Sequence, residues 1–122
     1  MIRGIKLGKV PVADQARALK FYTEMLGFTI ATDQAMGPGG QRWSELKIPG
    51  AETRVTLFTH DGHAERVGTF APFSLWSDDV QATYETLQAR GVAFVAPPKK
   101  ESWGTSVIFK DSEGNQLHLG SR

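Results

Sequence analysis

The chain has 122 residues, of which 40% are hydrophobic and 22% charged, with a formal net charge of +1 and no cysteine. These values fit one globular domain with a core, and they exclude disulfides, thiolate metal sites and a cysteine nucleophile. The balanced charge gives no drive toward nucleic acid or an anionic membrane, and no apolar run approaches a membrane span. The N-terminus lacks the apolar core of a signal peptide, so we expect a cytoplasmic protein that binds neither nucleic acid nor membrane.

The first half of the chain predicts a strand, a helix and three further strands. A β-rich run predicts the first strand at about 4–12, and Asp14 then provides an N-cap for a helix that Gly27 ends. Helical spacing turns four apolar side chains inward: Ala18, Tyr22, Met25 and Leu26. Turns rich in glycine and proline separate strands expected at 28–33, 42–48 and 53–59.

The second half repeats this order of elements. A strand at 70–77 precedes a helix at 78–91. Asp78 or Asp79 caps this helix and Gly91 ends it, and its spacing turns Val80, Tyr84 and Leu87 inward. Strands follow at 92–97, 105–111 and 115–120. A strand, a helix and three strands therefore occur twice, which favours an internal duplication with modules at about 1–62 and 68–122.

Two stretches resemble the vicinal oxygen chelate superfamily, which includes glyoxalase I, extradiol dioxygenases and the fosfomycin and bleomycin resistance proteins. They are "VPVADQARALKFYTEMLGF" near the N-terminus and "FKDSEGNQLHL" near the C-terminus. The resemblance implies one α+β domain over 1–122, in which two βαβββ modules form curved mixed sheets that line a cup. It also implies a homodimer. Because this fold carries several unrelated functions, the resemblance does not name an activity.

The resemblance assigns metal ligands to four positions of this chain, which are Leu7, Thr56, Pro72 and His118. Leu7 and Pro72 have no ligating atom, and a protonated threonine hydroxyl is a poor ligand. A single imidazole does not hold a divalent ion tightly. We therefore expect no metal and no other cofactor at this site, with a divalent metal as the less favoured alternative.

Strand alternation places a set of side chains on the face that would line the cup. The set comprises Lys9, Pro11, Trp43, Glu45, Arg54, Thr56, Phe58, Ser74, Trp76 and His118, and Trp103 on a proline-rich loop could close over it. Flat aromatic surface beside cationic groups suits a planar or amphipathic organic molecule with an acidic group. In the alternative interpretation Phe58 and Trp76 fill the core or a dimer interface, and Trp103 packs locally.

Three functions agree with these features. The first is a protein that binds a small organic molecule without metal, as bleomycin resistance proteins do. The second is a glyoxalase-type lyase or dioxygenase with a relocated metal site, which would combine His118 with two of Glu45, His60, His63 and Glu101. The third is a non-catalytic dimeric sensor or partner subunit. We favour a solvated turn over a metal pair for His60 and His63, and a solvated surface over an acid–base pair for Glu45 and His118.

Overall fold

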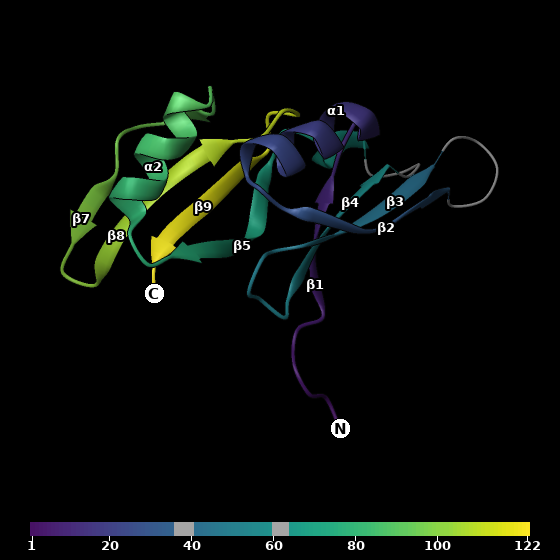
Figure 1. The fold of residues 1–122 in the computed structure, drawn as a ribbon, viewed down its shortest axis with the longest axis horizontal. Coiled ribbons are helices and arrows are strands. Elements are labelled where there is room, and N and C mark those ends of the chain that lie inside the picture. The colour runs from purple at the N-terminus through teal and green to yellow at the C-terminus, as the bar shows by residue number, and fades with distance from the viewer. Residues whose placement is uncertain (36–40, 60–63) are drawn as a thin grey trace. The chain divides into compact units, whose positions relative to one another are not determined.

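The computed structural model describes residues 1–35, 41–59 and 64–122. The chain divides into two compact units, Met1–Val67 and Gly68–Arg122. Each unit contains one mixed β-sheet and its own helix (Figure 1). No helix in these described residues is long and apolar enough to cross a membrane.

The first unit builds a four-stranded sheet in the order β1-β4-β3-β2. Strands β1 and β4 are parallel, and the other neighbours are antiparallel. Its elements are β1 (Leu7–Pro11), α1 (Gln15–Lys20), the π-helix η1 (Phe21–Met25), β2 (Thr29–Ala35), β3 (Arg42–Lys47), β4 (Arg54–Thr59) and the short 3-10 helix η2 (Ala64–Arg66).

The second unit repeats this plan with one extra strand. Its sheet has the order β5-β9-β8-β6, with β7 paired to β8, and again only the first and last strands of the unit pair in parallel. Its elements are β5 (Phe70–Ser77), α2 (Val80–Ala89), β6 (Ala93–Phe94), β7 (Lys99–Glu101), β8 (Gly104–Lys110) and β9 (Gln116–Ser121). The predicted α+β fold of two repeated modules is confirmed.

Both helical segments begin at a predicted N-cap and are followed by the predicted glycine. Asp14 and Asp79 each accept a hydrogen bond of 3.0 Å from the backbone N–H three residues later, so Asp79 rather than Asp78 is the second cap. Gly27 and Gly91 follow the helices with φ angles of 78° and 100°, in the left-handed region that favours glycine.

The first helix differs from the prediction in its last turns. It is α-helical only to Lys20 and continues as the π-helix η1, in which the N–H of Leu26 donates to the carbonyl of Phe21. The bond spans five residues instead of four, which rotates the side chains that follow it relative to an α-helix. Tyr22 is therefore fully buried, whereas Met25 and Leu26, predicted to face inward, are only partly buried.

The strand predicted at 92–97 is also shorter than expected. Only Ala93–Phe94 forms β6, although the N–H of Val95 still donates to the carbonyl of Ile108 at 3.0 Å. Pro97 and Pro98 have no N–H, so the ladder does not extend to the predicted end of the strand. The stretch expected to be a loop instead contains β7, whose residues pair with β8.

Each core lies between the helix of its unit and one face of its sheet. In the first unit the buried side chains include Val10, Ala18, Tyr22, Phe28, Leu46, Val55 and Leu57. In the second they include Val80, Leu87, Val92, Val107, Phe109, Leu117 and Leu119, and the predicted core residue Tyr84 is only half-buried, with its ring against Phe94. Strand alternation turns the intervening side chains to the opposite face, which we call the far face of each sheet.

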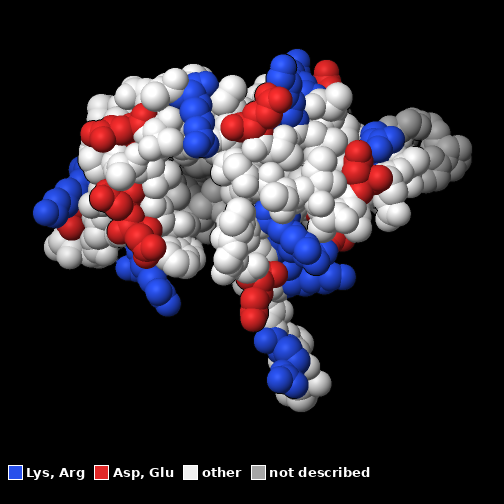
Figure 2. Space-filling view, viewed as in Figure 1, with Lys and Arg blue, Asp and Glu red and all other residues white. Residues whose placement is uncertain are grey.

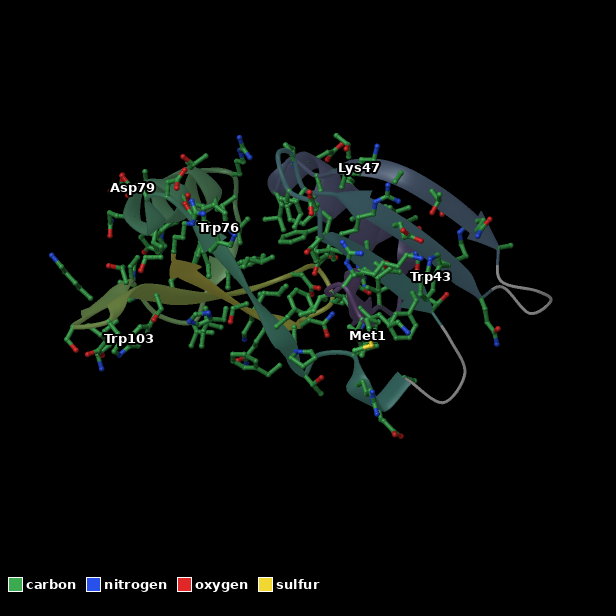
Figure 3. All side chains as sticks on the ribbon, turned by 90° about the horizontal axis from the view of Figure 1, so that it is seen from below. Met1, Trp43, Lys47, Trp76, Asp79 and Trp103 are labelled. Atoms are coloured by element: carbon green, nitrogen blue, oxygen red, sulfur yellow. The ribbon has the colours of Figure 1, made fainter. Side chains whose placement is uncertain are left out.

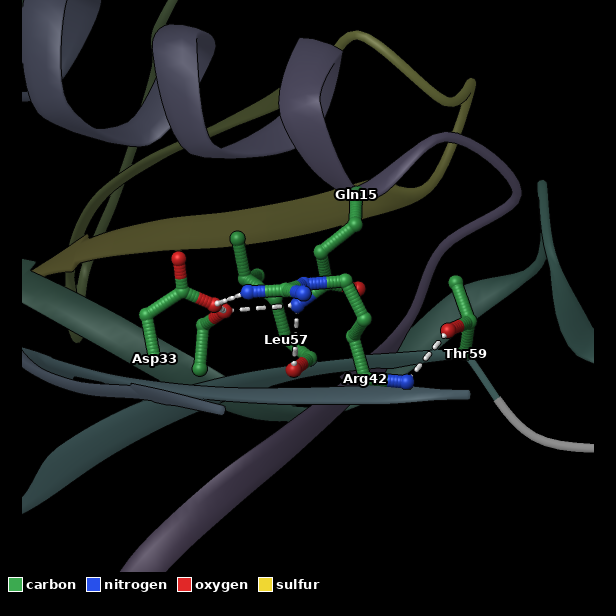
Figure 4. A network of polar contacts seen from close by, with 6 residues as sticks. Gln15, Asp33, Arg42, Leu57 and Thr59 are labelled. Atoms are coloured by element: carbon green, nitrogen blue, oxygen red, sulfur yellow. Dashed lines mark hydrogen bonds and ion pairs between the residues drawn. The ribbon is translucent and has the colours of Figure 1, made fainter. Parts of the chain in front are cut away.

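A polar network connects α1 to the first sheet within this core (Figure 4). Buried Gln15 donates from Nε2 to Ser44 Oγ at 2.7 Å and to the carbonyl of Leu57 at 3.0 Å. Ser44 in turn donates to Asp33, which also accepts a 2.8 Å bond from Arg42. The network therefore links the start of α1 to three adjacent strands.

Candidate functional site

The far face of the first sheet carries the seven side chains of this unit that were predicted to line the cup. The strand register sets Lys9, Thr56 and Glu45 side by side across β1, β4 and β3. In the same register Pro11, Phe58 and Trp43 form the next row. Arg54 lies two residues before Thr56 on the same face of β4. Seven side chains from three strands are thus brought together, as strand alternation predicted.

Trp43 contacts both an aromatic and a cationic member of this group. Its indole ring is 6.3 Å from the ring of Phe58, centroid to centroid, at an interplanar angle of 42°. The ammonium group of Lys9 lies over the indole, 5.6 Å from its centroid, within the range of a cation–π contact. Because Phe58 is only 9% exposed and Trp43 is partly exposed, Trp43 offers the flat apolar surface of this face.

Glu45 connects the aromatic and cationic parts of the face. The indole Nε1 of Trp43 donates to Glu45 Oε2 at 3.2 Å, and Arg54 donates to Oε1 at the same distance. The hydrogen bond from Trp43 lowers the pKa of the Glu45 carboxyl, and Arg54 lowers this pKa further, against a raising effect of burial. Each carboxylate oxygen therefore has a donor, and Glu45 is an ionised anchor for both neighbours.

Thr56 lies between Lys9 and Glu45 and is fully buried. Its hydroxyl has no hydrogen-bond partner among the described residues. A buried polar atom usually has one, from protein or from ordered water. The hydroxyl is enclosed by protein atoms, so the predicted ligand contact of Thr56 does not fit its burial.

The far face of the second sheet carries three further predicted residues. Ser74 of β5 lies opposite His118 of β9, and Trp76 lies opposite Gly120. Trp76 is 57% exposed, so it does not fill the core of its unit, and the guanidinium of Arg122 lies 5.0 Å from its ring centroid. His118 is half-buried, and its Nδ1 has no hydrogen-bond partner among the described residues.

Trp103 belongs to the turn between β7 and β8 and is 69% exposed (Figure 3). Most of its surface is open, and both the closing role and local packing of this ring stay predictions. In the adjoining strand Glu101, a candidate for a relocated metal site, pairs with Lys99 at 3.2 Å. His60 and His63 lie outside the described residues. Glu45 and His118 belong to different units, so the prediction that they do not act as an acid–base pair stays a prediction.

The four positions that the resemblance assigns to metal ligands do not fit a divalent ion. Leu7 stands on β1 and Pro72 on β5, and neither side chain has a donor atom. Thr56 offers a neutral hydroxyl, which leaves the imidazole of His118 as the only strong ligand of the four. Within residues 1–35, 41–59 and 64–122, no three His, Asp or Glu side chains gather as a metal ligand set.

Two features of this site were not predicted from the sequence. One is the contact of Arg122 with the ring of Trp76, since the last residues of the chain carry no periodic signal. The other is Gly120, although a glycine inside a strand of alternating residues suggests that something approaches the backbone closely there. Elsewhere acidic and basic side chains are interspersed over the face shown in Figure 2.

The chain is similar to known proteins over nearly its whole length. Residues 5–119 match the model of the Glyoxalase/Bleomycin resistance protein/Dioxygenase superfamily. The protein YetH of Bacillus subtilis (strain 168) is 38% identical over 119 residues, 98% of each chain.

Two solved structures extend this likeness to the fold. A superfamily member from Sphaerobacter thermophilus DSM 20745 is 32% identical with a TM-score of 0.88, covering 99% of this chain and 98% of that one. TnmS3, an antibiotic binding protein from Streptomyces sp. CB03234, is 36% identical with a TM-score of 0.84, covering 98% and 96%.

Proposed function

Because the chain belongs to the glyoxalase/bleomycin resistance protein/dioxygenase superfamily, we propose that it binds a small organic molecule on the far faces of its sheets, without a divalent metal. The observation that carries this proposal is the arrangement of Lys9, Trp43 and Glu45. These residues combine a flat indole, a cation and a fixed carboxylate on one sheet face. Such a mixture of apolar surface and a few placed polar groups is typical of small-molecule sites.

The ring of Trp43 would supply the main apolar contact. The Glu45 carboxylate holds the indole by its Nε1, and Phe58 packs against it, so little freedom is lost when a planar molecule stacks on the ring. Lys9 lies over the indole in the free protein. A planar ligand would take the place of the ammonium group on the ring, and Lys9 could then bond to a substituent at its edge.

The charges of this face favour an acidic or acceptor group on the ligand. Arg54 is already paired with Glu45. Lys9 has no ion pair among the described residues, so we assign the cationic contact to Lys9 rather than to Arg54.

The similarity to TnmS3, an antibiotic binding protein, supports an organic ligand of comparable kind. The side chains at Leu7 and Pro72 support binding without a metal at the family's position. We also propose that the chain forms a homodimer, as the family resemblance suggests. Light scattering at micromolar concentrations should give twice the 13.4 kDa chain mass, and a monomer throughout would contradict the dimer.

The direct test is calorimetric titration with a panel of aromatic acids and glycopeptide antibiotics. Trp43→Ala and Trp76→Ala should each weaken binding roughly tenfold to a hundredfold, the usual effect of a well-packed aromatic contact. Lys9→Met should reduce affinity for acidic members of the panel and spare neutral ones. Lys20→Met, at the exposed end of α1, is the matched control and should bind normally.

Two results would contradict the proposal. The first is the absence of saturable binding by any member of the panel. The second is about one metal ion per purified chain by elemental analysis, lost in His118→Ala, which would restore the metal-dependent alternative.

A further inference from the structure

Gly120 is the next-to-last residue of the paired strand β9, and its backbone conformation does not require glycine. It pairs with Trp76 of β5 and Ser106 of β8, and its φ is not in the left-handed region. Glycine is unfavourable inside a strand, because it has no side chain to pack and loses much conformational freedom. A space requirement is therefore the better explanation of this residue.

The neighbour that needs the space is the imidazole of His118, two residues earlier on the same face of β9. A Cβ added at Gly120 would lie 3.0 Å from His118 Cε1, 3.7 Å from Nδ1 and 3.9 Å from Nε2. These are its three nearest heavy atoms, and a carbon contact of 3.0 Å is tight enough that the imidazole would have to move by a few tenths of an ångström. The imidazole thus leans along the strand into the space that the missing side chain leaves.

The position of the ring also decides which nitrogen is available. Nδ1 is buried without a hydrogen-bond partner among the described residues. A neutral imidazole carries one proton, on one of its two nitrogens. Since a buried N–H without an acceptor is unfavourable, the proton is better placed on Nε2, which then acts as a donor.

We propose that Gly120 is a positioning residue, which holds the His118 ring so that Nε2 donates a hydrogen bond to an acceptor oxygen of the bound ligand. The ligand part of this inference rests on the proposed binding function. It adds a requirement to that function, since the ligand must present a carbonyl, carboxylate or phenolate oxygen at the second sheet. The geometric part, in which Gly120 sets the ring, does not depend on any ligand.

The test combines side-chain NMR with a double-mutant cycle. In Gly120→Ala, the ring ¹⁵N and Cε1–H resonances of His118 should shift, and the wild-type spectrum should show the tautomer protonated at Nε2. Affinity for the tightest-binding acid of the panel should fall roughly two- to tenfold, as expected for one hydrogen bond. In a His118→Ala background the same glycine substitution should have no further effect.

Each outcome separates this inference from the proposed function. Unchanged His118 resonances in a folded Gly120→Ala protein would overturn the positioning role, whether or not a ligand binds. If Gly120→Ala does not fold, adding His118→Ala should restore folding, and a failure to do so would also overturn it. A shifted ring with unchanged affinity would overturn the hydrogen bond to the ligand. If no member of the panel binds, the proposed function is overturned. The NMR comparison then still decides whether Gly120 sets the position of the His118 ring.

Discussion

The indole Nε1 of Trp43 donates a 3.2 Å hydrogen bond to Glu45, two residues along the same strand. The two side chains therefore share one sheet face, and the carboxylate fixes the orientation of the ring. Arg54 donates to the other carboxylate oxygen from the neighbouring strand. A change at Glu45 consequently alters an aromatic contact and a charge together.

Replacing Glu45 by alanine should destabilise the protein, because Trp43 and Arg54 both lose their acceptor. We expect the free energy of unfolding to fall by about 1 kcal/mol, since Arg54 is partly exposed and its ion pair is screened. Urea denaturation followed by circular dichroism measures the change. Glu52→Ala, at an exposed turn, is the control, and equal midpoints for the two variants would refute the anchoring role of Glu45.

Acid should destabilise the first unit through Asp33. The hydrogen bond from Arg42, with help from Ser44, lowers the pKa of this carboxyl below its ordinary value of 3.8. A folded-state pKa below the unfolded value gives stability that is complete above the unfolded pKa and is lost as the pH falls through the folded one. Asp33→Asn should therefore be less stable than wild type at pH 7, with a difference that disappears at low pH.

Urea midpoints for both proteins between about pH 7 and pH 2 measure this effect. Parallel curves, with the same difference at every pH, would show that the Asp33 carboxyl does not titrate differently in the folded and unfolded chains. Glu45→Gln should behave in the same direction, because the pKa of Glu45 is also lowered.

Gln15→Ala should remove the link between α1 and the first sheet. The substitution leaves the carbonyl of Leu57 and the hydroxyl of Ser44 without the donor that now reaches them in the core. Loss of such buried hydrogen bonds typically costs about 1–3 kcal/mol. Gln81→Ala, on the exposed side of α2, is the control and should change stability little. Equal decreases in the free energy of unfolding for the two variants would show that the buried hydrogen bonds of Gln15 do not stabilise the protein more than an exposed one.

The turn before the last strand depends on Asn115. Its side chain donates to Asp111 at 2.9 Å and accepts from the backbone N–H of Gly68 at 2.7 Å, so it connects the starts of β9 and β5. Asn115 is 2% exposed, and Asn115→Ala should lower the free energy of unfolding by about 1–3 kcal/mol. Ser112→Ala, in the same turn, should have a much smaller effect in the same denaturation experiment. An Asn115→Ala protein that unfolds at the same urea concentration as the wild type would contradict this bridging role.

Strand alternation was sufficient to predict which side chains share a face. Lys9, Trp43 and Thr56 come from three strands, yet a period of two places each of them opposite the core residues of its own strand. The helix caps were equally predictable, because a carboxylate at the N-cap satisfies N–H groups that every helix leaves free. These signals are local, and a single sequence contains them in full.

Features that depend on long-range contacts were not predictable in this way. Nothing in the local pattern distinguishes an α-helical from a π-helical turn at Phe21–Met25, since that choice depends on how the helix packs. The pairing of β7 with β8 joins residues of modest strand propensity, such as Lys99 and Lys100, and depends on a partner rather than on an intrinsic preference. The hydrogen bond of Trp43 with Glu45 could not be predicted either, because it depends on the rotamers of both side chains.

The row formed by Lys9, Thr56 and Glu45 has a consequence for how this protein can change. Each member stands on a different strand, and the backbone hydrogen bonds of the sheet are independent of which side chains point to the far face. Lys9 can therefore be exchanged to alter the preferred ligand charge while the indole and its anchor remain in place. Selection in the laboratory or in nature could replace the side chains of such a row one strand at a time. The preferred ligand would then change while the fold of the sheet stays the same.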